Sequence, residues 1–137
     1  MITRCVGLLV LGLLAVASMT EADTVKDHVV PIGKRLADWR PDDAEIRRFD
    51  RALPAAHAKA VADGKVDAVE LTTYARRYWG KRLRDTDVID IDLFCPARAA
   101  QALKNQPAPR GGGACFLHAR WDPKKGIVTH VWQNSSK

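Results

Sequence analysis

Two aspartates alternate with aliphatic residues in DVIDIDLFC, residues 87–95. Asp90 and Asp92 are two positions apart, so in a β-strand both carboxylates project from the same face of the sheet. Such a pair can hold a metal ion or carry out acid–base chemistry. On a solvated sheet, carboxylates beside cations more commonly form cross-strand ion pairs, which contribute roughly 0.2–1 kcal/mol each. We take the ion pairs as the preferred interpretation of this alternation.

Two histidines could extend this chemistry. His118 in FLHARW and His130 in IVTHVW belong to segments that have the pattern of a hairpin. If Trp121 pairs with Ile127, His118 lies opposite His130, and a zinc site or a general base becomes geometrically feasible. Zinc normally takes at least a third protein ligand, and only one of the two aspartates is within reach. We therefore predict no metal and no other cofactor, and we assign no catalytic residue.

The cysteines that follow these strands are expected to be bonded to each other. Once the first 22 residues are removed, Cys95 and Cys115 are the only cysteines left. Both belong to the more apolar, odd-numbered set of their strands, so in neighbouring antiparallel strands both sulfurs reach the same edge of the sheet. A disulfide there closes the loop of residues 96–114 and contributes roughly 3 kcal/mol by chain entropy. The alternative is a thiolate nucleophile paired with a histidine, which needs a reduced cysteine in an oxidising compartment.

The opposite, even-numbered face of the same strands is a candidate binding surface. It combines carboxylates, cations and aromatic rings, and aromatic side chains are typical anchors for a partner. The surface consists of Asp90, Asp92, Phe94, Phe116, His118, Arg120, His130 and Trp132.

A basic run precedes the aspartates. It comprises Arg76, Arg77, Lys81, Arg82 and Arg84, in a chain whose formal net charge is +6. Outside the cytoplasm such charge meets lipopolysaccharide, cell-wall polymers and acidic proteins, so we expect no nucleic acid partner. A solvated face with solubilising charge is the simpler interpretation of this run.

The first residues have the pattern of a secretory signal peptide. A single arginine precedes an apolar run from Val6 to Val16, and small and polar residues follow. The run is about half of the roughly 20 residues that cross a bilayer as a helix, so we expect removal and not anchoring. Ala17 and Ala22 both fit the last position of the leader, and we favour Ala22, which makes residues 1–22 the signal peptide. No later segment is apolar enough to cross a membrane, and the mature protein is predicted to be periplasmic or secreted.

After the leader we expect a short arm and one domain. Residues 23–40 show no sustained period and contain Pro31 and Gly33, which indicates a loosely attached arm. Residues 41–137 are the length of one small domain.

A helix is predicted at the start of this domain. Asp42 can cap it, with Glu45 at the third position, and Gly64 ends it. Pro54 removes one backbone hydrogen bond, so we expect a kink or a break near residues 50–54. The apolar stripe of the helix consists of Ile46, Phe49, Leu53, Ala56 and Ala60.

The sequence predicts four strands after the helix; residues 71–83 suit either a helix face or a strand, and their Thr, Tyr and Trp content favours the strand. The four strands cover residues 71–83, 87–95, 114–121 and 127–132, with polar turns at RDTD and DPKKG. A helical turn in ARAAQALK and a flexible proline- and glycine-rich stretch follow Cys95. The predicted fold class is therefore α+β, with one N-terminal helix packed on the aliphatic face of a four-stranded antiparallel meander.

Four motifs follow one another between about residues 71 and 130, namely YARRYWG, a basic turn, DIDLFC and GGGACFLHARWDPKKGIVT. Together they resemble a family of small, exported, functionally uncharacterised bacterial proteins. The resemblance implies a helix on an antiparallel meander, similar to cystatin-like sheets, with the two cysteines bonded, and it implies no activity. The chain departs from the family pattern by Leu93, where an aromatic residue is usual, and by a long proline-containing insertion after Cys95.

Three classes of function fit these features. The first is a periplasmic or secreted binding protein, such as an inhibitor or immunity protein directed against an envelope-acting enzyme. Small size, export, one disulfide and the lack of a catalytic motif favour this class. The second is an envelope-associated accessory protein that binds anionic polymers through the basic run. A small hydrolase ranks last because nothing pairs a nucleophile with a base, so we predict that the protein is not an enzyme.

Overall fold

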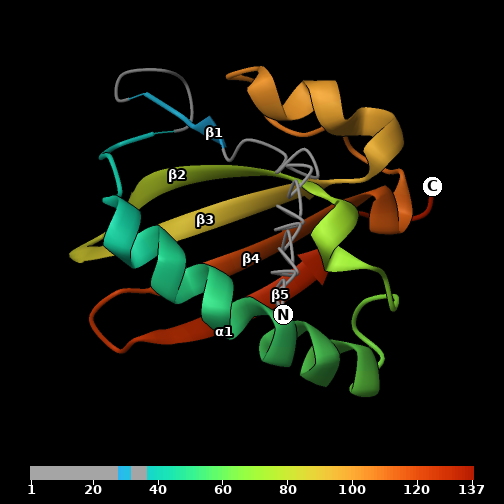
Figure 1. Ribbon diagram of the computed structural model, residues 1–137, viewed down its shortest axis with the longest axis horizontal. Coiled ribbons are helices and arrows are strands. Elements are labelled where there is room, and N and C mark those ends of the chain that lie inside the picture. Colours follow the sequence, from blue (N-terminus) through green and yellow to red (C-terminus); the bar gives the residue numbers. More distant parts are fainter. Residues whose placement is uncertain (1–27, 32–36) are drawn as a thin grey trace, which may run out of the picture.

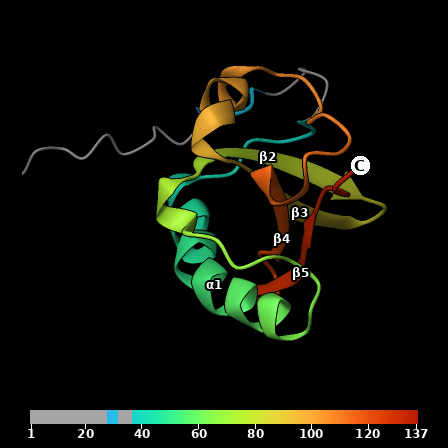
Figure 2. The same cartoon turned by 90° about the vertical axis from the view of Figure 1, so that its right-hand side faces the viewer.

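A five-stranded mixed sheet forms the centre of the protein in the computed structural model, which describes residues 28–31 and 37–137. Helix α1 lies across one side of this sheet, and the short helix η2 lies near one end (Figures 1 and 2). The strands lie side by side in chain order, from β1 to β5. The elements are β1 His28–Val29, α1 Asp43–Ala62, η1 Leu71–Thr73, β2 Ala75–Leu83, β3 Thr86–Phe94, η2 Pro96–Leu103, η3 Gly113–Cys115, β4 Phe116–Asp122 and β5 Ile127–Gln133.

Helix α1 begins where the capping pattern predicts. The carboxylate of Asp42 accepts a hydrogen bond from the backbone N–H of Glu45 at 2.8 Å, and Gly64, with φ +70°, follows the helix end in a left-handed conformation. Of the kink or break expected near Pro54, the break is wrong, because one helix runs through this residue. Leu53 and His57 are buried on either side of Pro54, and this packing holds the helix together despite the lost backbone bond.

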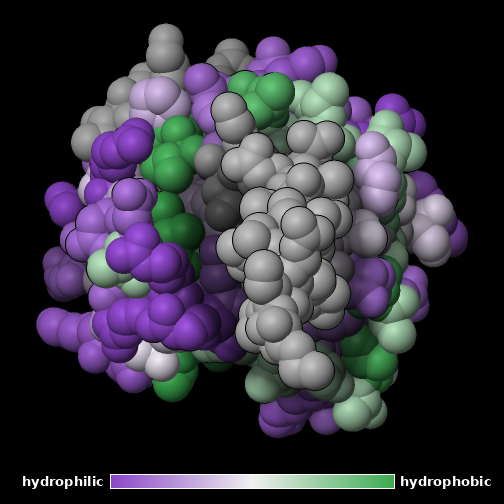
Figure 3. Space-filling model, viewed as in Figure 1, coloured by the Kyte–Doolittle hydropathy of each residue, from purple (hydrophilic) through white to green (hydrophobic). Residues whose placement is uncertain are grey.

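The predicted faces of the central strands are confirmed by the pairing between β3 and β4. Asp90 lies opposite Arg120 and Asp92 lies opposite His118 on one face. Ile89 and Ile91 point to the other face, where the apolar stripe of α1 packs against them. The outer side of α1 is hydrophilic and faces the viewer in Figure 3. One face of the sheet is therefore committed to the core, and the other is available for a site.

The four-stranded, wholly antiparallel sheet predicted from the sequence is wrong at its first edge. β1 pairs in parallel with β2, placing Val29 beside Tyr78, and the next residue, Val30, is fully buried. Trp39 also reaches β2, through a bridge to Gly80. The arm that was expected to be loosely attached thus packs on the sheet in its described parts. The sequence did not predict this strand, because two residues are too few to show an alternating pattern.

A disulfide joins the ends of β3 and β4. Cys95 and Cys115 are bonded with their α-carbons 4.7 Å apart, as predicted. Immediately after Cys95 the chain forms η2, whose Ala102 packs with Phe94 and Phe116 in a second, smaller core. The predicted helical turn is therefore present as a 3-10 helix, and it anchors the loop that passes over the open face of the sheet.

The predicted signal peptide, residues 1–22, lies outside the described residues. Within the part of the chain that the structure describes, no helix has the length and apolar character of a membrane span.

Candidate functional site

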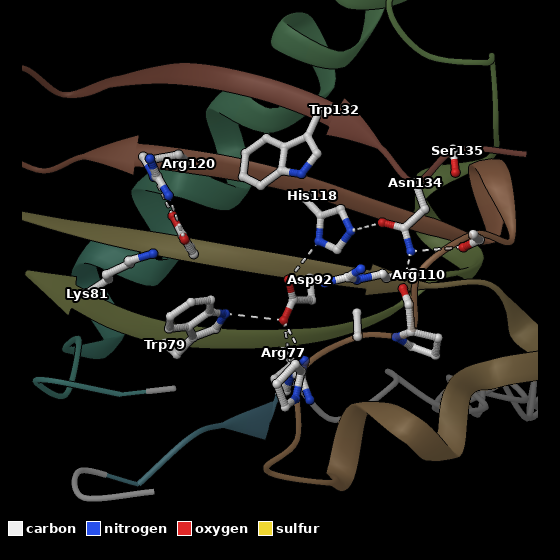
Figure 4. A pocket seen from close by; sticks show the side chains of 15 residues that line it. Arg77, Trp79, Lys81, Asp92, Arg110, His118, Arg120, Trp132, Asn134 and Ser135 are labelled. Atoms are coloured by element: carbon white, nitrogen blue, oxygen red, sulfur yellow. Dashed lines mark hydrogen bonds and ion pairs between the residues drawn. The ribbon is translucent and has the colours of Figure 1, made fainter. Parts of the chain in front are cut away.

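A groove of about 510 Å³ lies on the open face of the sheet, opposite α1. Strands β2 to β5 supply side chains to it, and residues 107–111 of the loop after η2 border it (Figure 4). We call it the polar groove. Its charged, amide and indole side chains come from Arg77, Trp79, Lys81, Asp90, Asp92, Arg110, His118, Arg120, Trp132 and Asn134.

Arg77 ties the sheet to the loop beneath the polar groove. Its side chain is 1 % exposed, and its Nε and Nη2 donate to Oδ2 of Asp92 at 3.0 and 2.7 Å. Its Nη1 donates to the backbone carbonyls of Lys104 and Gln106, both at 2.6 Å. A buried charge is stable only when it is paired and hydrogen-bonded. The Arg77 guanidinium has the Asp92 carboxylate as its countercharge and the two loop carbonyls as further acceptors. The first part of the loop is consequently held in place by a β2 side chain.

His118 continues this network toward the other wall. Its Nδ1 lies 2.8 Å from Oδ1 of Asp92, and its Nε2 lies 2.8 Å from Oδ1 of Asn134. The amide nitrogen of Asn134 donates to the carbonyls of Pro109, at 2.5 Å, and Gly111, at 2.9 Å. Carbonyls only accept, so the amide of Asn134 has to present its oxygen to His118. Both ring nitrogens of His118 thus face acceptors, and the arrangement requires the doubly protonated imidazolium.

The charges around the ring agree with this protonation state. Burial by itself lowers the pKa of His118, but the hydrogen bond and the negative charge of Asp92, together with the Asn134 bond, raise it above the ordinary 6.5. Burial likewise raises the pKa of Asp92, and the hydrogen bond from His118 and the charge of Arg77 outweigh it, so that this pKa lies below the ordinary 3.8. The centre of the groove is therefore made of three charged side chains, Arg77, Asp92 and His118, which we call the charged triad.

Two tryptophans flank the triad. Trp79 donates its indole N–H to Asp92 at 3.2 Å, which fixes the orientation of the ring. Trp132 stacks on His118 with ring centroids 5.2 Å apart, and it remains 39 % exposed. The side chain of Arg120, which pairs with Asp90 at 2.7 Å, lies 5.8 Å from the Trp132 ring. Rigid indoles beside a compensated polar centre are typical of a surface that binds a partner.

The predicted candidate surface is partly brought together in this groove. Asp90, Asp92, His118, Arg120 and Trp132 all line it. The predicted ion pairs are present, yet the face is not solvated as expected, since both aspartates are buried. The reason is that the neighbouring cations, the indoles and the loop after η2 cover the carboxylates, and alternation along a strand contains no information on such coverage.

The two phenylalanines do not act as exposed anchors. Phe94 and Phe116 are buried, with ring centroids 5.9 Å apart, in the second core under η2. Arg77 lies over the Phe94 ring at 5.0 Å, so Phe94 supports the triad from below. The segment after Cys95, whose role the sequence left open, covers them.

The predicted pairing of His118 with His130 is wrong. His118 lies opposite Trp132, and His130 lies opposite Arg120, because the turn pairs Asp122 with Ile127 and a bulge follows between β4 and β5. His130 is exposed and borders a different groove, between α1 and β5. The described residues contain no group of three or more His, Cys, Asp or Glu side chains arranged to hold a metal ion.

The basic run is divided between the two faces of the sheet. Arg76 points toward α1 and pairs with Asp50 at 2.8 Å, whereas Arg77 and Lys81 line the polar groove. Arg82, which pairs with Asp87, and Arg84, in the turn between β2 and β3, are exposed away from the groove. These five cations therefore do not form one continuous patch.

Among the polar, charged and indole side chains of the groove, sequence reasoning missed those of Trp79, Arg110, Asn134 and Ser135. The alternation of Arg77, Trp79 and Lys81 along β2 could have placed Trp79 on this face. Asn134 and Arg110 lie beyond a strand end and in an irregular loop, where no periodicity predicts their meeting.

Comparison of the chain with models of protein families, with curated proteins and with solved structures found no match. The resemblance to small exported bacterial proteins therefore stays a prediction, and the function has to be argued from the groove itself.

Proposed function

We propose that this protein is a non-enzymatic binding protein that acts in the periplasm or outside the cell, and that the polar groove is its ligand site. The observation that carries the proposal is the exposed Trp132, whose ring stacks on the buried His118. Aromatic anchors with locked geometry lose little conformational entropy on binding, and they contribute strongly to affinity. The disulfide favours an oxidising compartment.

The state of His118 argues for binding and against acid–base catalysis. Both of its ring nitrogens are engaged, with Asp92 and with Asn134, so neither is free to accept a proton from a substrate. No described cysteine thiol is available either, since Cys95 and Cys115 are bonded to each other. A hydrolase mechanism therefore has the weakest support among the three classes.

Within this proposal, an inhibitor or immunity protein against an envelope-acting enzyme is the role that we favour. A small, disulfide-bonded domain with a preformed groove suits the capture of a protein partner. The alternative is an accessory protein held to anionic polymers by its basic run. That alternative needs a broad cationic surface, and the division of the run between two faces weakens it.

Capture of a partner by wild type and by Trp132→Ala tests the proposal. The immobilised protein is exposed to envelope extracts and secreted material, retained proteins are identified, and each is purified and titrated. We expect one partner that binds stoichiometrically at high salt and that Trp132→Ala loses. Ile127→Ala is the matched control, because Ile127 is an exposed apolar residue of the same strand outside the groove.

Three results would contradict the proposal. If the Trp132→Ala variant retained the partner as well as wild type does, the polar groove would not be the binding site. Retention of polymers only, lost at moderate salt, would favour the accessory role. Turnover of a peptidoglycan or ester substrate by the purified protein would make it an enzyme.

A further inference from the structure

The unpaired charges of the polar groove are all positive in the part of the chain that the structure describes. Asp90 is paired with Arg120, and Asp92 with Arg77 and His118, so no carboxylate of the groove lacks a cation. Of the groove cations, Lys81 and Arg110 form no ion pair with a carboxylate of the described residues, and the Lys81 ammonium lies 5.5 Å from the centroid of the Trp79 ring. The groove is thus electrostatically complementary to an anion.

These two cations lie at separate places along the groove. Lys81 is four residues from Arg77 on β2, which corresponds to roughly 13 Å between their α-carbons in a strand. Arg110 belongs to the loop at the Arg77 end, and Figure 4 shows Lys81 and Arg110 on opposite sides of Asp92. An extended ligand that runs along the groove meets both cations.

In the middle of the groove, the charged side chains are paired with one another and two indole rings are present. Trp79 and Trp132 flank the triad there, and the nearby Arg120 is already paired with Asp90. A uniformly charged polymer or an anionic membrane would find few free cations in this middle section. A peptide with acidic residues at its two ends and apolar residues between them matches the pattern.

The position of Arg110 is built into the fold. It lies between Pro109 and Gly111, whose carbonyls both accept hydrogen bonds from the amide of Asn134. Asn134 is in turn held by His118. This clamp places the loop backbone around Arg110 before any ligand arrives, which lowers the entropy lost on binding.

We propose that the polar groove binds an extended acidic segment of a partner protein, with carboxylates at Lys81 and Arg110 and an apolar side chain against Trp79 and Trp132. This inference rests on the proposed function and specifies its ligand.

A labelled nine-residue peptide, with two glutamates at each end and an apolar centre, tests the ligand class by fluorescence anisotropy. We expect it to bind, and its counterpart with glutamines in place of glutamates not to bind up to 1 mM. Lys81→Gln and Arg110→Gln should each weaken binding about fivefold or more, because each removes one complementary charge. Asn134→Ala should weaken it as well, although Asn134 need not touch the peptide, because the clamp on Arg110 is lost.

Lys125→Gln is the matched control, since Lys125 is an exposed lysine in the turn between β4 and β5, outside the groove. It should stay within about twofold of wild type because its charge is remote from the ligand. The inference is overturned by peptide binding that ignores Arg110→Gln, by no binding up to 1 mM, or by preference for polygalacturonate or phosphatidylglycerol vesicles over the peptide. Partner capture that needs Trp132 but tolerates both charge variants would reject the acidic segment and leave the proposed function standing.

Discussion

At the scale of single residues, Asp92 is the centre of the site. It accepts hydrogen bonds from Arg77, Trp79 and His118, and it is itself buried. No other described carboxylate joins three elements of the sheet in this way. Its removal should therefore affect stability much more than the removal of a surface carboxylate.

Asp92→Asn should destabilise the protein by roughly 3–5 kcal/mol, because it leaves the buried guanidinium of Arg77 without a countercharge. Asp87→Asn is the control, since the ion pair of Asp87 with Arg82 is exposed to solvent and its loss should leave the unfolding midpoint almost unchanged. Urea unfolding followed by circular dichroism measures both changes. Equal, small decreases in the free energy of unfolding of the two variants would show that the charge of Asp92 does not stabilise the buried Arg77.

His118 should make the stability depend on pH. Its folded-state pKa is raised above 6.5, so its contribution is complete below that pH and is lost as the pH rises through the folded value. We expect the free energy of unfolding of wild type to fall between about pH 6.5 and the raised pKa, and this fall to be absent in His118→Gln. His130→Gln should keep it, because His130 is exposed and bonded only to the neighbouring Thr129. An unchanged pH profile in His118→Gln would contradict the imidazolium assignment.

At the scale of elements, secondary structure and its buried face are predicted best where burial of one face makes apolar residues recur at regular intervals along the sequence. The alternation of residues 87–95 predicted the correct faces for the aspartates and the aliphatic residues. The apolar stripe of α1 correctly predicted which side of the helix packs in the core. The site was only half predicted, since Asp92 and His118 come from alternating strands but Asn134 and Arg110 come from irregular backbone. The turn register and the bulge that together place His130 opposite Arg120 have no periodic signal in the sequence.

The attachment of the N-terminal segment to β2 depends on Gly80. A Cβ at this position would lie 2.3 Å from the backbone oxygen of Trp39, which cannot move independently of its chain. Gly80→Ala should therefore detach the segment, and the amides of Val30 and Asp38, which donate to the carbonyls of Tyr78 and Gly80, should exchange faster with solvent.

The control for this prediction is Gly64→Ala. A Cβ there meets nothing within 4 Å, although φ is +70°, so this change strains the end of α1 without touching β2. Hydrogen exchange by mass spectrometry separates the two effects. Slow exchange at Val30 and Asp38 in Gly80→Ala would show that Trp39 does not hold the segment on the sheet.

At the scale of the whole molecule, the disulfide closes the loop that forms one side of the site. It joins residues separated by 20 positions, and the enclosed chain includes η2 and the loop that carries Arg110. Without the bond, the unfolded chain gains freedom, and the loop in the folded state is held by noncovalent contacts, among them those of Arg77 and Asn134, the bond between His28 and Asn105, and the second core. Stability and site geometry should therefore be lost together but to different extents.

Replacement of both Cys95 and Cys115 by alanine should lower the free energy of unfolding by roughly 3 kcal/mol, as expected for a loop of this length. The cost arises mainly in the unfolded chain, so β2 to β5 and α1 should still fold at low temperature. The groove should be affected more than the sheet, because the covalent tether of the loop ends is gone, and trypsin should cut after Arg110 faster than in wild type. Urea unfolding and timed proteolysis measure the two effects separately. Unchanged cleavage at Arg110 alongside the full loss of stability would show that the polar clamp alone positions the loop, and that the disulfide serves the fold and not the site.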